Sequence, residues 1–87
     1  MFEIFISNQA KKFLRGIDRK IAGEMTDVLS FLKATPIPVK DFDVSKLSGE
    51  EDSYRIRIGR YRILYRIYWK ERKLRIIRIE TREAAYD

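Results

Sequence analysis

Apolar and basic side chains alternate with a period of two through residues 53–68, which read SYRIRIGRYRILYRIY. This alternation is typical of β-strands, because successive side chains of a strand point to opposite faces of a sheet. One face of the first run carries Ile56 and Ile58, and the other carries Arg55 and Arg57. The chain therefore has to build a sheet with one apolar face, which other elements must cover, and one basic face.

The second run, residues 61–69, continues this pattern after a turn at Gly59-Arg60. Its apolar face is predicted to lie in the core and carries Tyr61, Ile63, Tyr65, Ile67 and Trp69. Its other face carries Arg62, Leu64, Arg66 and Tyr68. We therefore expect the uncovered side of the sheet to collect Arg55, Arg57, Arg62 and Arg66. A third run, residues 73–80, alternates less cleanly, and its faces stay unassigned.

A short strand and two helices are predicted before these runs. Residues 2–6 alternate as a strand, and Ser7 can then cap a helix whose apolar residues recur at helical spacing. Asp18 can cap a second helix, which runs to about Ala34 and is stopped by Pro36. The two helices form a hairpin that packs on the sheet.

The segment between the helices and the later strands, residues 35–52, is acidic and interrupted by prolines. We interpret it as a loop that lies against the body of the protein. The predicted order is β-αα-β-β-β, an α+β fold in which the helical hairpin covers one face of a twisted antiparallel sheet. The position of the first strand in the sheet stays open. With 87 residues, the chain is expected to form a single domain, 1–87.

Several chemistries are excluded or disfavoured by composition. The chain has no cysteine and no histidine, so thiolate and imidazole metal ligands and the usual imidazole base are missing. Its acidic residues lack the spacing of a metal site, and its four glycines form no phosphate-binding loop. We expect no metal and no cofactor. No apolar run approaches the roughly 20 residues that cross a bilayer, so a cytoplasmic protein without membrane contact is expected.

The positive charge is concentrated near the end of the chain. Residues 53–87 carry eleven Lys and Arg against four acidic residues, a balance of +7, whereas the whole chain carries +6. Nine of the eleven are Arg, whose planar guanidinium suits bidentate contacts with phosphate. This distribution favours a polyanionic partner. The alternative is an Arg-rich surface of the kind found in thermophilic proteins.

Short motifs in this order resemble the RelE/ParE superfamily of bacterial and archaeal toxin–antitoxin toxins. They are Lys46-Leu47-Ser48-Gly49, Tyr54-Arg55-Ile56-Arg57, Arg60-Tyr61-Arg62-Ile63-Leu64-Tyr65 and Ile79-Glu80-Thr81-Arg82-Glu83. The resemblance spans the whole chain, because the order of elements in that family is the one predicted above. Of its branches, the resemblance favours the RelE-like toxins, which cut mRNA in the ribosomal A site, over the ParE-like toxins, which poison DNA gyrase.

The resemblance implies which residues act on RNA. The positions that match the catalytic residues of RelE-like toxins are Arg55, Arg57, Arg62, Arg82 and Tyr86. Here Arg stands on the second strand where the best-known relative has Lys, and Tyr86 follows Arg82 at a shorter spacing than usual. From their charge and position rather than from the resemblance, contacts to RNA or the ribosome are assigned to Lys40, Lys46, Arg60 and Arg66. For Arg60 and Arg66, solvation or a contact with an antitoxin remains the alternative. In such a site the arginines would orient the RNA and stabilise the transition state of metal-independent attack by a 2′-OH.

Structural roles remain as alternatives for several of these residues. Arg62 could be an ion-pair partner, for instance of Glu80, and Arg82 could be a solvated charge near the end of the chain. Tyr86 could be unstructured or packed in the core.

Two other functions remain open. They are a gyrase inhibitor of the ParE type and an RNA-binding module without enzymatic activity. If the toxin interpretation is right, the resemblance also implies the ribosome and mRNA as partners. It implies in addition a cognate antitoxin, which we expect to be small, acidic and helical.

Overall fold

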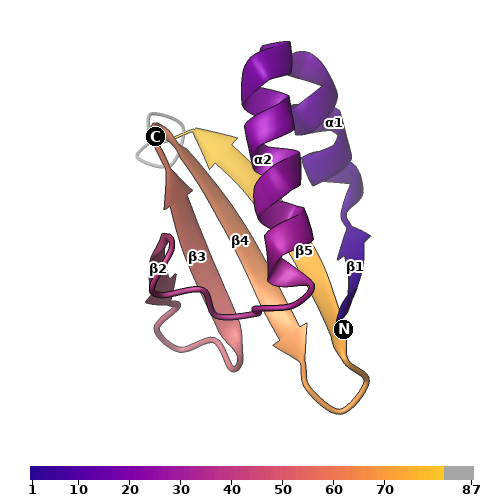
Figure 1. The fold of residues 1–87 in the computed structure, drawn as a ribbon, viewed down its shortest axis with the longest axis vertical. Helices are drawn as coiled ribbons and strands as arrows, with labels where there is room; N and C mark the ends of the chain where they lie inside the picture. Colours follow the sequence, from indigo (N-terminus) through magenta and orange to yellow (C-terminus); the bar gives the residue numbers. More distant parts are fainter. Residues whose placement is uncertain (82–87) are drawn as a thin grey trace.

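The computed structural model describes residues 1–81 and contains one five-stranded sheet with two helices on one of its faces (Figure 1). The strands lie in the order β1-β5-β4-β3-β2. In chain order, the elements are β1 (Glu3–Ile6), α1 (Asn8–Gly16), α2 (Arg19–Leu32), β2 (Asp43–Lys46), β3 (Ser53–Ile58), β4 (Tyr61–Tyr68) and β5 (Lys73–Thr81).

The predicted α+β class, with an N-terminal strand and a helical hairpin on one face, is confirmed. The antiparallel meander is confirmed too, since β3 pairs with β4 and β4 with β5. Ser7 and Asp18 cap the two helices, and their side chains accept hydrogen bonds from the backbone N–H groups of Ala10 and Lys20. The sheet is mixed rather than purely antiparallel, because β1 lies parallel to β5 at one edge.

The segment predicted as a loop, residues 35–52, contains a fifth strand. β2 pairs with β3 and forms the other edge of the sheet, with Val44 opposite Ile56 on the helix side. The prediction was wrong here because a strand of four residues is too short for its alternation of side chains to be recognised in a segment that also contains prolines. The rest of the segment leaves α2 and crosses the sheet to reach this edge (Figure 1).

The core lies between the helices and the apolar face of the sheet. Its fully or almost fully buried side chains are Ala10, Met25, Val28, Leu29, Leu32, Ile56, Ile63, Tyr65, Ile67, Leu74, Ile76 and Ile79. The hydroxyl of Tyr65 donates a hydrogen bond of 2.6 Å to the carbonyl oxygen of Pro36, which ties the segment after α2 to the core. Burial raises the pKa of Tyr65 above its ordinary value, and the neighbouring Tyr54 adds to this effect.

Trp69 does not belong to the core, contrary to the prediction. β4 ends at Tyr68, so the alternation stops one residue earlier than the sequence indicates. The indole is 47% exposed, meets the ring of Phe2 edge-on and donates a hydrogen bond of 3.3 Å to Asp52. Tyr61 is half-buried and packs against the core.

A β-bulge explains why the alternation of β5 is unclear. Leu64 pairs with Arg78 and Tyr65 pairs with Ile76, so Ile77 is an extra residue between them. Even-numbered residues therefore face the helices before the bulge, and odd-numbered residues face the helices after it. Leu74 and Ile76 are buried on the helix side, and after Ile77 it is Ile79 that is buried there.

The start of α1 supports this bulge. Ser7 binds β5 twice: its backbone N–H donates to the carbonyl oxygen of Ile76, and its hydroxyl donates to that of Ile77. After β1 has ended, the side-chain amide of Gln9 continues the hydrogen bonding to the edge of β5. Its nitrogen donates to the carbonyl oxygen of Ile79 at 2.9 Å, and its oxygen accepts from the N–H of Ile79 at 3.0 Å. One side chain thus replaces a missing peptide group at this edge.

Candidate nucleic-acid interface

The face of the sheet away from the helices, here called the open face, carries the predicted arginines. By strand register it presents Arg55, Arg57, Arg62, Leu64, Arg66, Tyr68, Lys73, Arg75 and Arg78, together with Phe5 at the β1 edge. Arg57 lies directly opposite Arg62, and Arg66 lies opposite Arg75. Cross-strand pairs of like charge are unfavourable in isolation, so this arrangement favours a bound anion.

Few carboxylates offset this charge. Asp43 on β2 lies opposite Arg57, and their charged atoms are 3.8 Å apart, with both side chains well exposed. Glu80 accepts a hydrogen bond of 3.0 Å from Nε of Arg78. The pair of Asp43 and Arg57 is exposed, so it contributes little and is screened by salt. The contact between Asp43 and Arg57 therefore leaves Arg57 accessible to a stronger anionic partner.

Arg55, Arg62 and Arg66 are partly desolvated, because their Nε atoms are covered from solvent. The Nε atoms of Arg55 and Arg66 also have no hydrogen-bond partner within residues 1–81. A covered donor without an acceptor is unfavourable by about 1–3 kcal/mol, more for a charged group. The guanidinium of Arg66 also lies over the ring of Tyr68, with Cζ 5.2 Å from the ring centroid. The arginine stems therefore lie along the sheet rather than extending freely into water.

The other predicted contact residues are not gathered on this face. Lys40 lies in a turn before β2, and Arg60 lies in the turn between β3 and β4. Lys46 ends β2 opposite Tyr54, a register position on the helix side of the sheet. All three are exposed. Arg82 and Tyr86 lie outside the residues that the structure describes.

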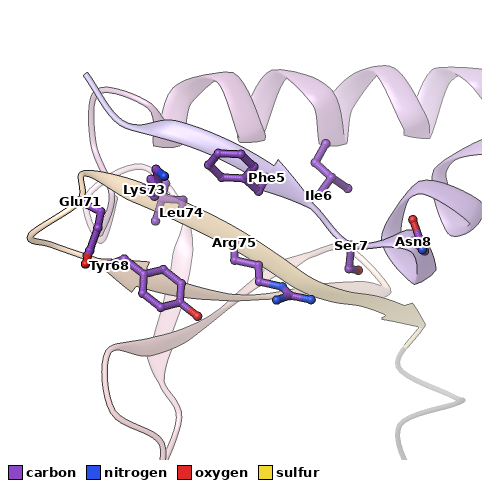
Figure 2. A pocket seen from close by; sticks show the side chains of 9 residues that line it. All are labelled: Phe5, Ile6, Ser7, Asn8, Tyr68, Glu71, Lys73, Leu74 and Arg75. Atoms are coloured by element: carbon purple, nitrogen blue, oxygen red, sulfur yellow. The ribbon is translucent and has the colours of Figure 1, made fainter.

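A pocket that the sequence did not indicate lies at the β1 side of the open face. It has a volume of about 600 Å³ and is lined by Phe5, Ile6, Ser7, Asn8, Tyr68, Glu71, Lys73, Leu74 and Arg75. Figure 2 shows Ile6 pointing towards the helices, while Tyr68 and Arg75 lie on the other side of the strands. We call this site the β1–β5 pocket. The only sequence signal for it is the placement of Phe5 between Ile4 and Ile6, which turns its ring away from the core.

Within residues 1–81, no group of acidic side chains is placed to hold a metal ion. No helix in this range is long and apolar enough to cross a bilayer.

Comparisons with known proteins agree with this architecture. The family model described as ParE toxin of type II toxin-antitoxin system, parDE, matches residues 4–86. The chain belongs to the RelE/ParE superfamily of type II toxins. It is also 33% identical over 85 residues to a protein named RelE1 from Methanocaldococcus jannaschii, covering 98% of this chain and 94% of that one.

Solved structures of the superfamily have the same fold. The chain resembles a chain of the archaeal RelE–RelB complex from Pyrococcus horikoshii with a TM-score of 0.85 and 30% identity, over 93% of this chain and 94% of that one. It resembles a chain of the intact RelBE toxin–antitoxin complex of E. coli with a TM-score of 0.78 over 93% and 96% of the two chains. The latter likeness, at 18% identity, concerns the fold alone.

Proposed function

We propose that this toxin is a ribosome-dependent endoribonuclease that cuts mRNA in the A site. The observation that carries the proposal is the gathering of Arg55, Arg57 and Arg62 on one uncovered face of a rigid sheet, in a chain without histidine. Membership of the superfamily supports it, as does the 33% identity to RelE1.

The proposed reaction uses the RNA as its own nucleophile. The 2′-oxygen attacks the neighbouring phosphorus and displaces the 5′-oxygen of the next nucleotide. The 2′-OH loses a proton, and the leaving oxygen gains one. Charge builds up on the phosphate oxygens in the transition state, and guanidinium groups fixed on a sheet can stabilise it without reorganising. No step in this scheme needs a metal ion.

The proposed residue roles follow from position. Arg57 and Arg62 lie opposite each other on β3 and β4, so one phosphate between them would meet both charges. Arg55 would hold the next part of the strand. We assign Arg82 to the transition state and Tyr86 to base stacking or proton transfer on the resemblance alone. Lys40, Lys46, Arg60 and Arg66 remain our candidates for contacts with ribosomal RNA.

Dependence on the ribosome follows from the poor basicity of the site. The guanidinium group of arginine is too weak an acid to lose its proton at any physiological pH. It can stabilise charge but cannot take the proton from the 2′-OH. We therefore propose that the ribosome positions the message and completes the site, so that free RNA is cut slowly or not at all.

We also propose a cognate antitoxin, because the similar chains from Pyrococcus horikoshii and E. coli were solved in complexes of RelE with RelB. An acidic, amphipathic segment would suit the open face by charge. Its binding there would cover the arginines and keep the toxin inactive.

Primer-extension mapping of mRNA in a reconstituted translation system tests the nuclease proposal. We expect cuts within the A-site codon, and the double variant Arg57→Ala/Arg62→Ala should cut about 10²-fold more slowly or worse. Arg82→Ala should be impaired too. Arg19→Ala, which removes an exposed charge from α2, is the matched control and should cut normally. Intact message with the wild-type protein would reject the proposal.

A second candidate function is inhibition of DNA gyrase, because the matching family model is described as a ParE toxin. It predicts that the purified chain blocks supercoiling by gyrase and leaves mRNA intact. The open-face arginines favour the nuclease, since binding to gyrase does not require a row of phosphate-binding side chains. A supercoiling assay run beside the primer extension separates the two functions.

A further inference from the structure

The β1–β5 pocket is separate from the arginines assigned to cleavage. Tyr68 follows Arg62 by six residues on the same strand, which corresponds to about 20 Å along β4. The pocket also uses β1, which contributes none of the proposed catalytic residues. Its volume of about 600 Å³ lies within the range of ligand sites, about 300–1,000 Å³.

Aromatic rings and cations alternate around this pocket. The rings of Phe5 and Tyr68 are 46% and 36% exposed. Nζ of Lys73 lies 5.3 Å from the ring centroid of Phe5, and the guanidinium of Arg66 lies over Tyr68. Arg75 pairs in register with Phe5 on one side and with Arg66 on the other. Exposed rings flanked by cations form the combination that binds single-stranded nucleic acid, in which bases stack and phosphates pair with charge.

We propose that the β1–β5 pocket binds one nucleotide of single-stranded RNA, with the base against Phe5 and Tyr68 and the phosphate beside Lys73 and Arg75. This inference rests on the proposed function, because RNA is the ligand which that function brings to the open face. It adds a site that would hold the strand at a distance from the scissile bond.

Glu71 gives the site a direction. Its carboxylate lines the same pocket, at the end near Tyr68, whereas the Arg75 guanidinium extends towards Ser7 and Asn8 (Figure 2). The phosphate is therefore expected at the Arg75 end. A base at the Glu71 end can donate a hydrogen bond to this carboxylate, through an exocyclic amino group in adenine, cytosine and guanine or through the N3–H of uracil.

Fluorescence anisotropy with a labelled 12-nucleotide oligo(A) at low salt tests the inference on the full chain without ribosomes. Phe5→Ala and Tyr68→Ala should each weaken binding about fivefold or more, the lower end of the effect of losing one stacked base. Phe31→Ala is the matched control, because Phe31 is 39% exposed on α2, and its loss should leave binding unchanged. Phe5→Leu keeps apolar bulk at the site and should weaken binding as well, which covers the case that Phe5→Ala does not fold.

Ligand variants separate base stacking from charge. An abasic oligomer of equal length should bind about fivefold or more weakly than oligo(A), because it has no base to stack on Phe5 and Tyr68. Equal binding of the abasic oligomer would overturn the inference, as would unchanged binding by both Phe5→Leu and Tyr68→Ala. Loss of binding to an acidic peptide of equal charge in the same variants, with RNA binding intact, would assign the pocket to a protein partner instead. Because these measurements need no cleavage, their failure is distinct from failure of the nuclease proposal.

Discussion

The two faces of the sheet share one backbone and differ in almost every other property. On β4, Ile63 and Tyr65 are fully buried under the helices, while the neighbouring Arg62 and Arg66 point to the open face. The covered face obtains its stability from packed apolar area, whereas the open face keeps charges near one another with few carboxylates between them. The comparison indicates a division of labour, in which one face stabilises the fold and the other is kept for binding.

The largest effect is expected from truncating neighbours on the two faces. Ile63→Ala should lower the free energy of unfolding by about 2–5 kcal/mol, because it leaves a cavity beneath the helices. Leu64→Ala, one residue later on the open face, should cost about 1 kcal/mol or less. Urea denaturation followed by circular dichroism measures both. Equal losses would contradict the division of labour.

Replacing an open-face arginine should separate activity from stability. Arg55→Leu should reduce mRNA cleavage about 10²-fold and leave the free energy of unfolding unchanged or raised by up to about 1 kcal/mol, because it removes a covered donor without a partner. On the same preparation, primer extension measures the rate of mRNA cleavage and urea denaturation measures the free energy of unfolding. Arg55→Lys is the control that keeps the charge and should retain part of the activity. A large loss of stability would give Arg55 a structural role.

A smaller effect is expected where α1 holds the edge of β5. Gln9→Ala removes both hydrogen bonds to Ile79 and should lower the free energy of unfolding by about 1–2 kcal/mol. Exchange of the Ile79 amide proton should accelerate more than that of the Ile63 amide on the central strand. Gln9→Glu keeps the acceptor for the Ile79 N–H and should protect that proton better than Gln9→Ala. Equal exchange in both variants would contradict this role.

The smallest effect concerns the hydroxyl of Tyr65. Tyr65→Phe should cost about 1 kcal/mol at neutral pH, through loss of the hydrogen bond to Pro36. Because burial raises the pKa of Tyr65 in the folded protein, the unfolded chain releases this proton first. The stability due to the neutral phenol is therefore complete below pH about 10 and falls as the pH rises above that value. The difference between wild type and Tyr65→Phe should shrink above pH about 10, as urea denaturation at pH 8–11 would measure. A constant difference would contradict it.

Much of the fold could be predicted from periodicity. Residues 54–58 and residues 61–68 each alternate without interruption, so the helix side and the open side of β3 and β4 follow from sequence. β2 could not be found in this way, because it is four residues long and its pairing with β3 is a contact distant in sequence. β5 could not be assigned because Ile77 interrupts its phase. The parallel pairing of β1 depends on how the helices cross the sheet, which no local pattern records.

The candidate site was predictable to a similar extent. Shared strand faces gave Arg55, Arg57, Arg62 and Arg66 correctly, because strand geometry alone decides them. Lys46 was expected in a loop, as a contact to RNA or the ribosome, whereas it ends β2 at a register position on the helix side. The β1–β5 pocket was missed because its walls come from both ends of the chain, and Phe5 reads as an ordinary strand residue until β1 is placed beside β5.

The extra residue makes β5 tolerant of a change in length at this position. Deleting Ile77 would place Arg78 directly after Ile76, and regular alternation would keep Arg78 and Glu80 on the open face and Ile79 under the helices. Losing one residue from β4, which has no extra residue, would instead exchange its core and open-face side chains. Among natural homologues, a gap at Ile77 should therefore be better tolerated than a gap in β4.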